Sequence, residues 1–140
     1  MARTRGHRLR SCLALVTVLA LALPATALAA AFWGYGVGGK PTATITWQPD
    51  NQQQKVKAVL FTLPVKVKSA KTRLGTRCTV PKGHPRQARC PISPHTSFGY
   101  VDLKAKKRIP CKATFRFAVK PVGGTHWVRQ SDLRSANGCG

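Results

Sequence analysis

The segment Cys111–Lys120, "CKATFRFAVK", contains the clearest structural signal in the sequence. Its apolar residues occupy every second position: Ala113, Phe115, Phe117 and Val119. Basic residues occupy positions between them: Lys112, Arg116 and Lys120. Because successive side chains of a β-strand point to opposite faces, this alternation predicts a strand with one buried face and one basic, solvent-facing side.

The same period of two recurs along the chain. Further alternating segments are residues 42–47 ("TATITW"), 55–68 ("KVKAVLFTLPVKVK") and 98–106 ("FGYVDLKAK"), with a final candidate at 125–130 ("THWVRQ"). Pro64 has no amide hydrogen, so it predicts an edge position, a bulge or a break within the segment 55–68. Residues 79–94 are rich in Pro, Gly, His and Arg, and we expect an irregular loop there.

No helical period follows the first thirty residues, so the fold class expected is all-β. We predict a small antiparallel β-sandwich of the immunoglobulin-like type, following an N-terminal signal peptide helix. The residues expected in its core are Ile45, Trp47, Val59, Phe61, Val101, Phe115, Phe117 and Trp127.

Residues 1–29 have the three-part layout of a secretory signal peptide. A leader with four arginines precedes an apolar run of 12 residues, Cys12–Leu23, and Ala27-Leu28-Ala29 forms a cleavage pattern. The run is shorter than the roughly 20 residues that span a bilayer, which favours cleavage over the alternative, an uncleaved N-terminal anchor.

Cleavage would leave residues 30–140 as a single small secreted β domain. Within it we expect a flexible Gly-rich start at 30–41 and a polar tail at 131–140. We therefore place the protein outside the cell or on the cell envelope.

The charge balance is strongly positive. The chain has 24 Lys and Arg residues against three acidic residues, a formal net charge of +21. Without the four leader arginines, 20 basic residues remain against the same three acids, a charge of +17. Such a field attracts polyanions, so anionic cell-wall polymers or lipid headgroups are the expected partners. The candidate contacts lie opposite the apolar faces of their strands: Lys66, Lys68, Lys112, Arg116 and Lys120.

Four cysteines follow the leader: Cys78, Cys90, Cys111 and Cys139. In an oxidising compartment they are expected to form disulfides, and four cysteines allow three connectivities. We favour Cys78 with Cys90 and Cys111 with Cys139. His84 and His95 interleave with the first pair, but the short paired spacing of zinc ligands is absent, so no metal is expected.

The Gly-rich stretch 34–40 matches two nucleotide-binding patterns, yet its context excludes both. A phosphate loop lies between a strand and a helix, whereas this stretch follows a processing site and precedes Pro41 and a β-branched run. We expect no cofactor. The three acids, Asp50, Asp102 and Asp132, lie in no catalytic motif, so no enzymatic activity is expected either.

Residues 30–44, "AAFWGYGVGGKPTAT", resemble the start of secreted actinobacterial surface proteins loosely grouped with camelysin and TasA. The matching residues are Ala31, Phe32, Trp33, Gly36, Gly38 and Ala43. The segment 111–120 and residues 121–140, with their Gly-Gly turn and Asn-Gly-Cys, are similar to further fragments of that group. The resemblance implies an immunoglobulin-like β-sandwich at the cell surface, and it supplies no catalytic residues.

These observations favour an exported, non-enzymatic, envelope-associated or secreted protein with a strongly basic surface. One alternative is a secreted cationic effector, either antimicrobial or binding nucleic acid non-specifically. Nucleic acid is the less favoured partner, because few aromatic residues alternate with the basic ones. A second alternative is a degenerate or truncated surface protein without function.

Overall fold

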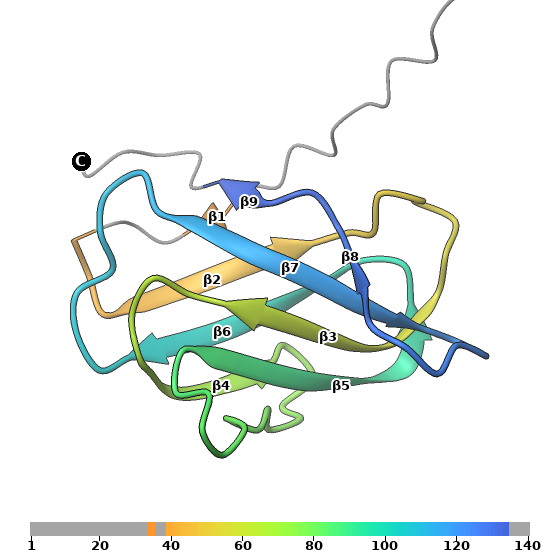
Figure 1. Cartoon of the computed structure of the whole chain (residues 1–140), viewed down its shortest axis with the longest axis horizontal. Helices are drawn as coiled ribbons and strands as arrows, with labels where there is room; N and C mark the ends of the chain where they lie inside the picture. Colours follow the sequence, from red (N-terminus) through yellow and green to blue (C-terminus); the bar gives the residue numbers. More distant parts are fainter. Residues whose placement is uncertain (1–33, 36–38, 135–140) are drawn as a thin grey trace, which may run out of the picture.

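The computed structural model describes residues 34–35 and 39–134, and the expected signal peptide at 1–29 lies outside this range. The described chain consists of β-strands joined by turns and loops (Figure 1). The strands are β1 (Gly34–Tyr35), β2 (Thr42–Trp47), β3 (Val56–Thr62), β4 (Val67–Thr72), β5 (Gln87–Thr96), β6 (Gly99–Ala105), β7 (Thr114–Pro121), β8 (Val128–Arg129) and β9 (Leu133–Arg134).

The strands form two antiparallel sheets, as the alternating pattern predicts. One sheet, which we call sheet A, has the order β1-β2-β6-β4. The other, sheet B, has the order β5-β3-β7-β8, and β9 pairs with β7 beside β8. The fold is therefore an all-β sandwich, and the predicted fold class is confirmed.

The core lies between the sheets and is built from the inward positions of each strand. Phe117 is its central side chain, because its ring stacks on Phe61 of the neighbouring strand at 5.3 Å between centroids. Across the sheets, the ring of Phe117 also tilts against the indole of Trp47 at 6.2 Å. All the predicted core residues are buried except Trp127, which is half-buried. The Arg89 guanidinium lies over the Trp127 ring, 5.4 Å from the ring centroid.

The prediction of an irregular loop at 79–94 was wrong over its second half. Residues 87–96 form β5, in which Ala88, Cys90 and Ile92 are buried. Pro91 and Pro94 obscured this alternation in the sequence. They are tolerated because β5 is an edge strand, where a missing amide donor costs no internal ladder hydrogen bond.

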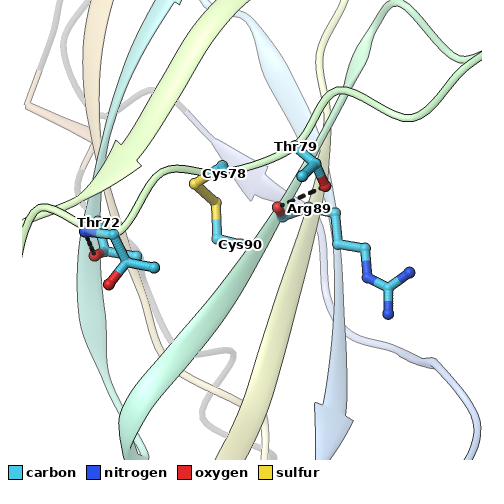
Figure 2. Close-up of a disulfide and its surroundings, with 6 residues drawn as sticks. Thr72, Cys78, Thr79, Arg89 and Cys90 are labelled. Atoms are coloured by element: carbon cyan, nitrogen blue, oxygen red, sulfur yellow. Dashed lines mark hydrogen bonds between the residues drawn. A yellow bond between two sulfur atoms is a disulfide. The ribbon is translucent and has the colours of Figure 1, made fainter.

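A disulfide joins Cys78 to Cys90, as expected (Figure 2). It fastens the segment after β4 onto β5, where Thr79 and Arg89 also exchange two backbone hydrogen bonds at 2.8 Å. Cys111 is itself disulfide-bonded, and Cys139 lies outside the described residues, so the second pairing stays a prediction.

Both ends of the described chain contribute short strands that the sequence did not reveal. Gly34 and Tyr35 pair with Ile45 and Thr44, within the stretch expected to be a flexible start. Leu133 lies in the expected polar tail, yet it is buried and opposite Phe115.

Gly99 lies where the core leaves no room for a side chain. A Cβ atom at this position would be 2.7 Å from Cζ2 of Trp47, whose side chain is buried. We therefore predict that Gly99→Ala lowers the free energy of unfolding by about 1–3 kcal/mol, the usual cost of overpacking. Denaturant unfolding followed by tryptophan fluorescence measures the change.

Gly124→Ala is the comparison variant, because its nearest contact would be Pro121 at 3.2 Å on a turn. It should lose clearly less stability than Gly99→Ala. Equal losses would contradict the packing argument.

The Cys78–Cys90 bond closes a loop between residues 12 apart in sequence. By chain-entropy arguments a loop of this size contributes about 3 kcal/mol to the free energy of unfolding. The double variant Cys78→Ala/Cys90→Ala should lose about this amount under oxidising conditions, as measured by denaturant unfolding. An unchanged unfolding midpoint would show that β5 is held by its ladder alone.

Candidate functional site

Four loops meet at one end of the sandwich, to the left in Figure 1, where β2, β4, β5 and β7 begin and β3 and β6 end. They are residues 39–41, 63–66, 81–86 and 106–113. We call this the basic end, for the residues that it carries. Their sequence positions are far apart, so only the strand registers bring them together.

Backbone hydrogen bonds fasten these loops to one another. The amide of Lys106 donates to the carbonyl of Lys66 at 2.8 Å, and the amide of Ile109 donates to the carbonyl of Lys40 at 3.0 Å. The amide of Leu63 donates to the carbonyl of Arg86 at 2.8 Å. The basic end is therefore one connected surface.

Eight basic residues lie on these loops, and all are exposed: Lys40, Lys66, Lys82, Arg86, Lys106, Lys107, Arg108 and Lys112. The four loops contain no acidic residue. Like charges this close raise the electrostatic energy of the folded chain, and counterions or a bound polyanion would lower it.

The three carboxylates of the acidic side chains lie elsewhere, and each has its own partner. Asp50 accepts a hydrogen bond from the amide of Ser131 at 3.0 Å, and Asp132 pairs with Arg129 at 3.2 Å. Asp102, in the middle of β6, accepts a hydrogen bond from the Thr44 hydroxyl at 2.7 Å. None of them neutralises the basic end.

The outer face of sheet A continues the positive surface. It forms a shallow hollow of about 770 Å³ whose basic lining residues are Lys40, Lys71, Arg77 and Lys104. The Thr44–Asp102 pair lies among them and supplies the single carboxylate of this hollow. The positive surface of the basic end therefore continues along this face.

The five residues predicted to contact polyanions divide among three places. Lys66 and Lys112 belong to the basic end, and Lys68 is exposed on the edge strand β4. Arg116 and Lys120 lie on the outer side of β7 in sheet B, where Arg116 is exposed and Lys120 is half-buried. The structure therefore places two of the five together with residues that the sequence did not single out.

The missed residues are Lys40, Lys82, Arg86, Lys106, Lys107 and Arg108. Residues 106–108 form a run of three basic residues, and that run was the available signal. Lys82 and Arg86 gave none, because their loop reaches the basic end only through the pairing of β5 with β3.

Cys78 and Cys90 are bonded to each other, so neither is a thiolate ligand for zinc with His84 or His95. Within the described residues, no cluster of His, Cys, Asp and Glu side chains could hold a metal ion. The part of the chain that the structure describes also contains no helix long and apolar enough to cross a membrane.

Comparisons with known proteins assign no family to this chain. No family model matches the chain, and no curated protein matches it. Among solved structures, the crystal structure of BslA, described as a bacterial hydrophobin, is similar with a TM-score of 0.43 and 15% identity over 74% of this chain and 92% of that one. A DUF4466 family protein from Parabacteroides merdae has a TM-score of 0.37 and 12% identity, over 82% of this chain and 42% of that one.

Neither structure is described as a member of the actinobacterial group that residues 30–44 resemble, so that resemblance stays a prediction. At these similarities no functional conclusion passes from either protein to this chain.

Proposed function

We propose that this protein is an exported, non-enzymatic β-sandwich that holds anionic polymers of the cell envelope at its basic end. One observation carries the proposal: eight exposed cations lie on hydrogen-bonded loops that contain no acidic side chain. Such a surface binds phosphate- or carboxylate-bearing chains by releasing their counterions. Anionic lipid headgroups present the same chemistry in a plane.

The absence of stacking partners favours a polymer backbone over nucleobases as the ligand. The four basic loops include no Phe, Tyr or Trp side chain, and His84 is their one imidazole. Single-stranded nucleic acids are held by aromatic platforms beside basic grooves. The basic end offers charge without such a platform, which makes nucleic acid a weaker ligand than a wall polymer of equal charge density.

Export is supported by the buried Cys78–Cys90 disulfide, because structural disulfides persist in oxidising compartments. The same compartment contains the anionic polymers that the proposal requires. The non-enzymatic assignment is supported by the three separated carboxylates, since each already serves a threonine, a backbone amide or an arginine.

The proposal predicts that binding depends on the basic end and not on total charge. The triple variant Lys66→Gln/Lys106→Gln/Lys107→Gln removes three charges there. Removal of one lysine–phosphate contact should reduce the slope of log K against log salt by about one. Binding to poly(glycerol phosphate), measured by calorimetry at several salt concentrations, should therefore weaken, and its slope should fall by about three.

The matched control is Lys55→Gln/Lys57→Gln/Lys120→Gln. It removes the same charge from the part of sheet B that lies farthest from the basic end. It should keep nearly the parent slope. Equal weakening by both triple variants would show that only net charge matters, and binding that ignores salt would overturn the proposal. Tighter binding to single-stranded DNA than to poly(glycerol phosphate) would support the cationic-effector alternative instead.

A further inference from the structure

A second site lies at the opposite end of the sandwich, where β2 and β4 end and β6 begins. A cavity of about 180 Å³ opens there between the turn at Arg73–Leu74 and the connection from β5 to β6, which contains Phe98. Its apolar lining comes from Trp47, Leu74, Ile92, Pro94, Phe98 and Tyr100. Drug-sized ligands occupy about 300–1,000 Å³, so this volume suits one ring or a short chain.

Two donor groups at this cavity lack an acceptor. The indole N–H of Trp47 is buried and has no hydrogen-bond partner among the described residues. The Arg73 guanidinium lies over the Tyr100 ring, 4.3 Å from its centroid, and no carboxylate of the described residues pairs with it. The three acidic side chains of the sequence are engaged elsewhere, so the chain supplies no acidic side chain to this site.

The mouth of the cavity is unusually apolar for a surface. Leu74 and Phe98 flank it with 73% and 59% of their surface exposed, more than any other large hydrophobic side chain that the structure describes. They belong to different turns and line the same cavity. Exposed apolar groups gathered in this way mark binding sites more often than isolated ones do.

We propose that this cavity binds a small organic anion, a carboxylate on an apolar body of one ring or a short chain. The apolar body contacts Leu74, Phe98 and Tyr100, and the carboxylate pairs with Arg73. An anion fits because no acidic side chain competes for Arg73. The Tyr100 ring beneath the guanidinium compensates its positive charge only in part.

The Trp47 N–H gives the site its second polar contact. A buried donor without an acceptor destabilises the folded chain. A hydrogen bond from this N–H to a ligand oxygen therefore contributes more binding free energy than a hydrogen bond from a solvated donor would. Gly99 covers the same edge of the indole, since a Cβ there would lie 3.0 Å from Nε1. The indole nitrogen is buried in this structure, so a ligand oxygen bonds to it only if the segment before β6 moves away from the indole.

This site is independent of the basic end, which lies across the length of the strands. The two differ in chemistry as well, because a polymer contact needs exposed charge whereas this cavity needs an apolar body. Loss of one binding activity therefore leaves the other measurable.

The test uses phenylacetate as the probe, with acetate and 2-phenylethanol as matched probes that lack the apolar body or the charge. With ¹⁵N-labelled indoles, the Trp47 Nε1–H signal is assigned by comparison with Trp33→Phe and Trp127→Phe. We expect phenylacetate to bind at millimolar concentration and to move this signal downfield, as a new hydrogen bond would. Acetate and 2-phenylethanol should bind about tenfold more weakly.

Arg73→Gln should weaken phenylacetate binding about three- to tenfold, and Leu74→Ser/Phe98→Ser should weaken it further without unfolding the chain, because both side chains are exposed. The basic-end triple variant should bind phenylacetate as the parent does. A Trp47 signal that phenylacetate does not move, or equal affinity for 2-phenylethanol, would overturn the proposal.

Discussion

The contact of Phe117 with both Phe61 and Trp47 is the interaction on which the rest of this structure depends. Phe61 and Phe117 lie side by side in sheet B, and Trp47 reaches them from sheet A. These three rings fix the distance and the relative position of the two sheets. With the sheets held face to face, the strand registers bring the strand ends together in two groups, the basic loops at one end and the apolar cavity at the other.

The charge of the chain makes this contact necessary. The 20 basic residues that follow residue 29 repel one another in any compact state, and the described residues form a single ion pair, Arg129–Asp132. Apolar burial and the Cys78–Cys90 bond must therefore offset a repulsion that ion pairs do not relieve. Eight of these 20 residues lie exposed on the loops of the basic end, where salt or a partner can screen them.

The fold could be predicted from the sequence because its signal is local. Alternation around Phe115 and Phe117 determines the buried face of β7 whatever the rest of the chain does, and the same holds for β2. β5 was missed because Pro91 and Pro94 are poor strand residues, and only its edge position makes them acceptable. The basic end could not be predicted for a different reason. The proximity of Lys82 and Arg86 to Lys66 follows from sheet registers, which a pattern of residues along the chain does not contain.

The loops at the two ends of the sandwich differ in composition. Loops at the basic end combine lysine and arginine with prolines such as Pro41, Pro64 and Pro110, which restrict the backbone and hold the charges apart at low entropic cost. The turns at the other end expose Leu74 and Phe98 beside one cation, Arg73. A surface that served only solubility would mix charged and apolar side chains at both ends. The separation of the basic loops from Leu74 and Phe98 by the length of the strands instead fits the two proposed ligands, an anionic polymer at the basic end and a small organic anion at the apolar cavity.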